Sequence, residues 1–134
     1  MYSIERMPFG IKLVLADYLS TKEATRWAKE MKEMLAVLQR EAPGKFGVLI
    51  DMRTLKPPSA EAQAEIQGVQ KAYVQGQVAR TVVILASHVV TLQFRRIAKE
   101  TGMDAKERYL DASSLPDWEE KALAWLERGV EPGD

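Results

Sequence analysis

The stretch of sequence that decides the fold is GVLIDMRTLKPPSAEAQ, from Gly47 to Gln63. An unbroken apolar run, Val48 to Ile50, ends at Asp51, and a short loop with two prolines leads to a helical pattern from Ser59. This order predicts a buried strand that runs into a helix, with polar residues just past the strand's carboxyl end. In open α/β sheets, ligands and partners usually bind at that edge.

The segment before this stretch predicts an amphipathic helix. Ser20 and Glu23 have the spacing of a capping box, in which both side chains satisfy free backbone N–H groups at a helix start. Pro43 and Gly44 end the pattern. Between these signals the apolar residues recur at helical spacing, at Ala24, Trp27, Ala28, Met31, Leu35 and Leu38. We expect this stripe to pack against a sheet.

The remaining segments continue the alternation of strands and helices. Strands are predicted at residues 2–7, 11–16, 46–52, 81–86 and 108–110, and further helices at 59–77, 88–101 and 114–128. Pro8-Phe9-Gly10 predicts a hairpin turn between the first two strands. Gly68 indicates a helix that bends or lies close to the sheet. Apolar stripes are expected at Ala62, Ile66, Val69 and Tyr73, at Val90, Phe94 and Ile97, and at Trp118, Ala122, Trp125 and Leu126.

The order β-β-α-β-α-β-α-β-α predicts a single α/β domain with a mostly parallel sheet and an antiparallel first strand. We assign residues 1–129 to this domain and residues 130–134 to a flexible tail, because the last five residues include a Pro-Gly pair.

Composition excludes several classes of function. Cysteine is absent, which excludes disulfides and cysteine nucleophiles and fits a cytoplasmic location. The 19 basic and 19 acidic residues cancel, so we expect no nucleic-acid partner, and the local cluster Arg95, Arg96 and Lys99 is interpreted as a solvated helix face. No apolar run approaches the roughly 20 residues of a membrane span. The sequence has one histidine and no glycine-rich phosphate loop, so we expect no bound metal and no other cofactor.

The sequence resembles a known group of domains in three blocks. These are GVLIDMRTLKPPSAEAQ, then RTVVILASHVVTLQFRRIAKETG, and finally ERYLD with SSLPDWEEKALAWL. Together they resemble the STAS-like, or SpoIIAA-like, small bacterial domains, which are related in architecture to anti-sigma-factor antagonists. The resemblance covers nearly the whole chain from MYSIE onward. It implies a STAS-like fold and a role in protein–protein binding.

The resemblance also implies a regulatory phosphorylation site. In anti-sigma-factor antagonists a serine at the start of the helix after the third strand is phosphorylated, within an Asp-Ser-Ser-Gly motif. Ser59 stands at the matching place, while the Asp, the second Ser and the Gly of that motif are absent from this sequence. We therefore expect Ser59 to cap the helix, with a phosphorylation switch as the alternative.

Polar residues follow several predicted strands and should gather at the carboxyl edge of the sheet. Besides Asp17, Tyr18 and Ser113, this edge includes the candidate binding residues Asp51, Arg53, Thr54, Ser59, Ser87, His88 and Asp111. A hydrolase would need Ser87 and His88 with Asp51 or Asp111. Neighbouring Ser87 and His88 diverge at a helix start, however, and no nucleophile-elbow motif is present.

A structural interpretation accounts for most of these residues. Ser20, Ser59, Ser87 and Ser114 would cap helices, with Asp117 completing a second capping box after Ser114. Asp51 and Asp111 would accept backbone N–H groups at turns. We therefore expect a non-catalytic protein-binding or regulatory module, whose partner is an unidentified protein or a second copy of this chain. The alternative is a carrier of a small apolar ligand or lipid, because relatives in the wider group bind such ligands.

Overall fold

The computed structural model describes residues 1–75 and 78–133. The strands are β1 (Tyr2–Met7), β2 (Gly10–Leu15), β3 (Phe46–Asp51), β4 (Val78–Leu85) and β5 (Glu107–Asp111). The helices are α1 (Thr21–Glu41), α2 (Ala60–Gln75), α3 (His88–Thr101), the short 3₁₀ helix η1 (Met103–Ala105) and α4 (Trp118–Arg128). The strands form one sheet in the order β1-β2-β3-β4-β5. As predicted, β1 pairs antiparallel with β2, and β2 to β5 are parallel.

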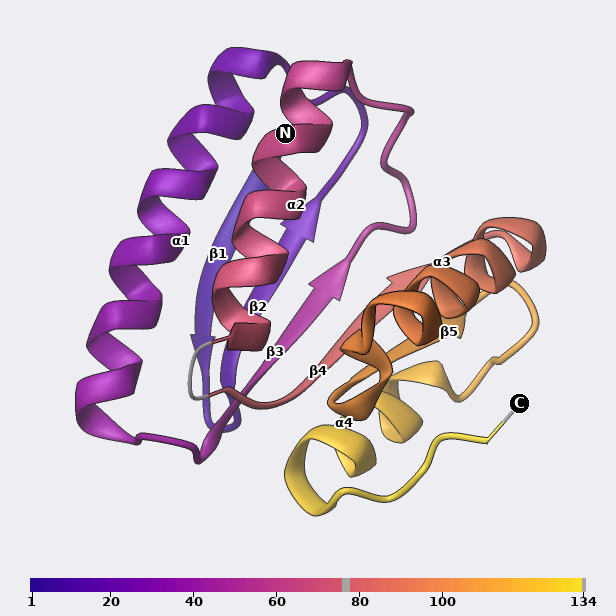
Figure 1. The fold of residues 1–134 in the computed structure, drawn as a ribbon. Helices are drawn as coiled ribbons and strands as arrows, with labels where there is room; N and C mark the ends of the chain where they lie inside the picture. Colours follow the sequence, from indigo (N-terminus) through magenta and orange to yellow (C-terminus); the bar gives the residue numbers. More distant parts are fainter. Residues whose placement is uncertain (76–77, 134) are drawn as a thin grey trace.

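The helices cover both faces of this sheet (Figure 1). Side chains of α1, α2 and α3 pack with one face, on a core that includes Trp27, Ile66 and Val83. Side chains of α4 pack with the other face, against Leu49 and Ile84. The two cores explain why the central strands read as continuous apolar runs rather than as an alternation.

Strands β3 and β4 form the centre of the sheet. Every residue of β3 is buried, and the parallel register pairs Leu49 with Val82 and Ile50 with Val83. The prediction of two adjacent, buried parallel strands is confirmed. Their carboxyl ends bring Asp51 and the residues after Leu85 to the same edge.

Helix α1 has the predicted start and the predicted buried stripe. The Ser20 side chain accepts a hydrogen bond from the backbone N–H of Glu23, and the Glu23 carboxylate accepts one from the backbone N–H of Ser20. The six stripe residues are the ones that the helix buries. Local sequence signals and tertiary packing therefore agree along this helix.

The β1–β2 hairpin turns at Pro8 and Phe9, and β2 begins at Gly10. Gly10 has a φ of 141°, and a Cβ there would lie 2.2 Å from the backbone oxygen of Gly47 on the neighbouring strand. A glycine at this position lets β2 and β3 approach each other at the start of their pairing.

Two expectations about helices are wrong, and one of the two alternatives expected at Gly68 is excluded. Gly68 is exposed on α2, and a Cβ there would meet no atom within 4 Å, so it marks no close approach to the sheet. Ile97 is 47% exposed, because α3 buries instead the side that carries Thr91 and Ala98. Helix α4 begins at Trp118 rather than at Ser114, since the Ser114 hydroxyl donates to Asp111 instead. The predicted end of α2 at Gln77 lies outside the described residues.

The segment after α4 contacts the domain at two points. Glu131 forms a salt bridge with Arg108, and the Pro132 carbonyl accepts a hydrogen bond from Lys121. Within residues 1–75 and 78–133, no helix has the length and apolar character needed to cross a membrane.

Candidate binding edge and groove

Backbone hydrogen bonds join the loops after β2 and β3 at the carboxyl edge. The Asp17 N–H donates to the Thr54 carbonyl at 3.0 Å, and the Lys56 N–H donates to the Asp17 carbonyl at 2.8 Å. Asp17 adopts a φ of 55°, a left-handed conformation that aspartate tolerates better than most residues. The side chains of Asp17, Tyr18 and Thr54 are exposed on this joined loop pair.

Asp51 and Arg53 form a paired unit at the end of β3. Two nitrogens of the Arg53 guanidinium donate to the two Asp51 carboxylate oxygens, at 3.0 and 2.9 Å, and the Arg53 backbone N–H donates to the same carboxylate. The guanidinium also lies 4.5 Å from the ring centroid of Trp118. These contacts fix the loop after β3 to the first turn of α4, and the hydrogen bonds to Asp51 raise the pKa of Arg53.

Asp111 organises the corresponding turn after β5. Its buried carboxylate accepts hydrogen bonds from the backbone N–H and the hydroxyl of Ser113, and from the hydroxyl of Ser114 at 3.2 Å. These bonds, led by the one from the Ser113 hydroxyl, lower the pKa of Asp111, and the nearby His88 lowers it further. Asp111 and His88, which come from separate strand ends, thus lie close enough to interact electrostatically.

Ser87 and His88 occupy the start of α3. The Ser87 hydroxyl oxygen accepts a hydrogen bond from the Val90 N–H at 3.2 Å, so Ser87 is the cap that the sequence predicts. His88 is the first helical residue and is exposed. The contact between Ser87 and His88 that a hydrolase would use is not found among the hydrogen bonds of the described residues.

Ser59 caps α2 and also contacts the start of α1. Its hydroxyl oxygen accepts a hydrogen bond from the Ala62 N–H at 3.1 Å and lies 3.0 Å from the Thr21 hydroxyl. The amino ends of α1 and α2 lie side by side as a result (Figure 1). The candidate edge residues therefore fall into separate hydrogen-bonded groups: Asp51 with Arg53, Asp111 with Ser113 and Ser114, and Ser59 with Thr21.

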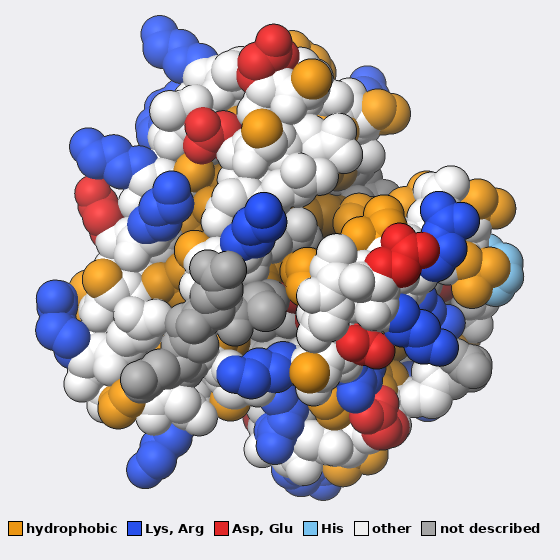
Figure 2. Space-filling model, viewed as in Figure 1, with side chains coloured by type: hydrophobic (Ala, Val, Ile, Leu, Met, Phe, Trp, Pro, Cys, Tyr) orange, Lys and Arg blue, Asp and Glu red, His pale blue; other side chains and the backbone are white. Residues whose placement is uncertain are grey.

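A largely apolar groove lies between α2 and α3 and reaches this edge. One part, of about 440 Å³, is lined by Phe94, Ile97 and Met103 among others. The adjoining part, of about 240 Å³, reaches the loop after β3 and is lined by Leu55, Pro57, Pro58, Ile66 and Val90 among others. Figure 2 shows apolar side chains in the hollow between the two helices.

Glutamine side chains line the same groove. Gln63, Gln67 and Gln70 come from α2, and Gln93 comes from α3. Our reading of the sequence did not identify this row, although residues 63, 67 and 70 have the i, i+4, i+7 spacing of one helix face. The groove thus combines an apolar floor with uncharged groups that both donate and accept hydrogen bonds.

A buried acidic side chain lies in the sheet between α2 and α3. Glu107 is 1% exposed, and its carboxylate accepts 2.7 Å hydrogen bonds from the hydroxyls of Thr81 and Tyr109. Burial raises the pKa of Glu107. Burial also raises the pKa of the nearby hydroxyl of Tyr73, and Glu107 raises it further. In the sequence, Glu107, Tyr109 and Asp111 are spaced two residues apart. This spacing places their side chains on one face of β5.

The comparison with solved structures agrees with this architecture. The chain is similar to an uncharacterized protein of the DUF3478 family with a SpoIIAA-like fold, from Shewanella loihica PV-4. The TM-score is 0.67 at 15% sequence identity, over 94% of this chain and 92% of that one. No family model and no curated protein matches the chain. The protein is therefore a single α/β domain with a SpoIIAA-like fold, as the sequence resemblance predicted.

Proposed function

We propose that the protein is a non-catalytic binding module of regulatory type that holds an extended segment of a partner protein in the groove between α2 and α3. The observation that carries this proposal is the row of glutamine amides beside an apolar floor. Apolar side chains of the partner would enter the hollow near Val90 and Phe94. Its backbone would pair with the exposed amides of Gln63 and Gln67 on α2.

The spacing of the amides suits an extended chain. Gln63 and Gln67 lie four residues apart on α2, which corresponds to about 6 Å along a helix. An extended strand repeats every two residues, over roughly 6.6 Å, and presents an N–H and a C=O in each repeat. Each glutamine has both a donor and an acceptor, so neighbouring amides match neighbouring backbone groups of the partner.

A carrier of a small apolar ligand is the second candidate. The two parts of the groove have volumes of about 440 and 240 Å³, within the range of small-molecule sites. The amides favour the peptide over a lipid chain, because an apolar chain would remove water from them without replacing their hydrogen bonds.

We propose no catalytic step for the polar edge. The Ser87 hydroxyl oxygen already accepts the Val90 N–H, and Asp111 already binds the hydroxyls of Ser113 and Ser114. These contacts support structural roles for the residues that a hydrolase would use as nucleophile and acid.

A peptide selection with an NMR readout tests the proposal. Peptides selected on the immobilised protein should shift the amide signals of Gln67 and Phe94, and the double substitution Gln63→Ala with Gln67→Ala should weaken binding about tenfold or more. Gln39→Ala, a change of the same chemistry on α1, is the matched control and should leave binding unchanged.

Native mass spectrometry of the purified protein separates the two candidates. A co-purified lipid at equimolar amount, retained in the double glutamine variant, would replace the peptide proposal with the carrier. If the selected peptides shift only the NMR signals of Arg53, Thr54 and their neighbours, the binding site is at the carboxyl edge of the sheet rather than in the groove.

A further inference from the structure

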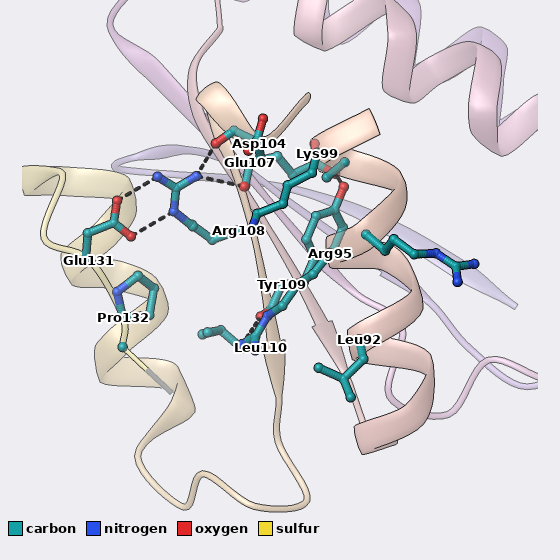
Figure 3. Close-up of a pocket in the computed structure, with 13 residues that line it drawn as sticks. Leu92, Arg95, Lys99, Asp104, Glu107, Arg108, Tyr109, Leu110, Glu131 and Pro132 are labelled. Carbon is teal, nitrogen blue, oxygen red and sulfur yellow. Dashed lines mark hydrogen bonds and ion pairs between the residues drawn. The ribbon is translucent and has the colours of Figure 1, made fainter. Parts of the chain in front are cut away.

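A second hollow, of about 610 Å³, lies between α3, the edge strand β5 and the segment of residues 130–133. Figure 3 shows Arg95 and Lys99 on the α3 side and Glu131 and Pro132 on the opposite side, with Arg108 between them. Helix α3 separates this hollow from the groove described above. An inference about it therefore does not depend on the proposed function.

Arg108 is arranged to hold a carboxylate. Its Nε and Nη2 donate to the two oxygens of Glu131, at 2.8 and 2.6 Å. Its Nη1 donates to the backbone carbonyls of Asp104 and Glu107, and its guanidinium lies 4.1 Å from the ring centroid of Trp125. Because these other contacts do not involve Glu131, they position the two-nitrogen fork whether or not Glu131 occupies it.

The carboxylate that now occupies the fork is easily exchanged. The side chain of Glu131 is 65% exposed, whereas that of Arg108 is 25% exposed. An ion pair with one partner so open to water contributes little to stability. The structure thus contains a receptor for a carboxylate, occupied by the exposed carboxylate of Glu131 from the same chain.

The remaining lining of the hollow carries an excess of positive charge. Arg95, Arg96, Lys99 and Arg108 line it, against Asp104, Glu131 and the buried Glu107. Arg95 donates to the Tyr109 carbonyl at 3.0 Å, which holds its charge beside β5. Leu92 adds an apolar contact, with 48% of its surface exposed. When Glu131 leaves, the surface that remains is complementary to an acidic segment with an apolar residue.

We infer that this hollow is a docking site for an extended acidic segment of a partner protein, whose carboxylate displaces Glu131 from Arg108. The segment at Glu131 shows the chemistry of the occupant: a carboxylate, followed by a proline that is buried against the domain. The Glu131 carboxylate acts as a competitor within the chain, so partner binding includes its release from Arg108, while Pro132 stays bound through the hydrogen bond from Lys121.

Peptide binding to the full chain tests the inference. The probe is a peptide with the sequence of residues 129–133 and blocked ends, compared with the same peptide carrying glutamine in place of its glutamate. Glu131→Gln frees the fork without shortening the chain, and Glu127→Gln on α4 is the matched control. By NMR titration, the acidic peptide should bind the Glu131→Gln protein at least about fivefold more tightly than the wild type or the control.

The site of binding is checked by two further changes in the Glu131→Gln background. Arg108→Lys keeps the positive charge but removes the pair of parallel N–H donors. It should weaken binding of the acidic peptide at least about fivefold. Lys99 lies on the exposed surface of α3, so Lys99→Gln should leave the fold intact. This change should weaken binding of a peptide that carries two further glutamates. The shifted signals should include Leu92 and Leu110.

Specific results would overturn the inference. These are equal affinity for wild type and Glu131→Gln, equal affinity for the acidic and the amide peptide, or signals confined to the groove between α2 and α3. A wild-type dimer that Glu131→Gln dissociates would make a second copy the occupant. A short single-stranded oligonucleotide that displaces the peptide at lower concentration would make nucleic acid the occupant.

Discussion

The carboxylate of Glu107 accepts a hydrogen bond from the hydroxyl of Tyr109, two residues along the same strand, at 2.7 Å inside the core. Thr81 on β4 donates a second bond to this carboxylate, and burial raises its pKa. Burial also raises the pKa of Tyr109, with Glu107 adding to the shift. The protein therefore holds an acid whose charged form is disfavoured by folding.

This acid should make stability depend on pH. Because the folded-state pKa of Glu107 is raised, its contribution to stability is fully present below the unfolded pKa, and is lost as pH rises through the folded pKa. Glu107→Gln removes this ionisation, so the stability of the variant relative to wild type should increase between pH 4 and pH 8. Urea unfolding across that range measures the difference.

The matched control is Glu107→Leu, which also removes the ionisation but accepts no hydrogen bonds. It should leave the hydroxyls of Thr81 and Tyr109 unpaired in the core, at a cost of about 1–3 kcal/mol each. A wild-type protein whose stability follows the same pH curve as Glu107→Gln would contradict the assignment.

Two glycines should respond to alanine in opposite ways. Gly10→Ala places a Cβ 2.2 Å from the Gly47 oxygen, at a φ of 141°, and should destabilise the fold by at least about 2 kcal/mol. Gly68→Ala meets open space within a helix and should stabilise it by up to about 1 kcal/mol. Thermal unfolding of the two variants measures both effects. A similar loss of stability in both variants would contradict the close approach of β2 and β3 at Gly10.

Local sequence signals predicted the elements well, because each signal reports on its own segment. The Ser20–Glu23 box and the α1 stripe needed no tertiary information. The signal at Ser114 failed because a capping serine competes with every nearby acceptor, and the buried Asp111 takes its hydroxyl. The close approach expected at Gly68 is absent for a related reason, since the sequence of a helix does not determine which atoms of the sheet lie next to its glycine.

The candidate site was less accessible from the sequence. The convergence of strand ends placed Asp51, His88 and Asp111 at one edge, and the structure places them there. The groove between α2 and α3 depends on how far apart two helices pack, which the sequence of neither helix determines. The pairing of Arg108 with Glu131 joins residues 23 positions apart through a tail that carried no helix or strand signal.

The pKa of Asp111, in the turn after β5, should rise when Ser113 is changed. The hydrogen bond from the Ser113 hydroxyl is the main cause that lowers the pKa of Asp111. A lowered folded-state pKa gives stability above the unfolded pKa that is lost as pH falls through the folded pKa. Ser113→Ala should therefore raise the pKa of Asp111, measured by NMR of its carboxyl carbon. Ser114→Ala is the control and should raise it less, because its bond is the weaker cause.

Ser59 provides a test of the cap against the regulatory switch. Ser59→Ala removes the acceptor for the Ala62 N–H and should cost about 1 kcal/mol, whereas Ser59→Asp should be nearly neutral, because aspartate caps equally well. Ser87→Ala removes the same kind of cap from α3 and provides the reference cost.

The binding readout decides between the two roles of Ser59. A phosphate there would lie at the partly positive amino end of α2, 3.0 Å from the Thr21 hydroxyl at the amino end of α1. It would therefore add about two negative charges next to Pro57 and Pro58, which line one end of the groove. We expect Ser59→Asp to leave the affinity for a selected peptide within about twofold of wild type, as a simple cap requires. A loss of tenfold or more with unchanged stability would instead assign Ser59 the switch role.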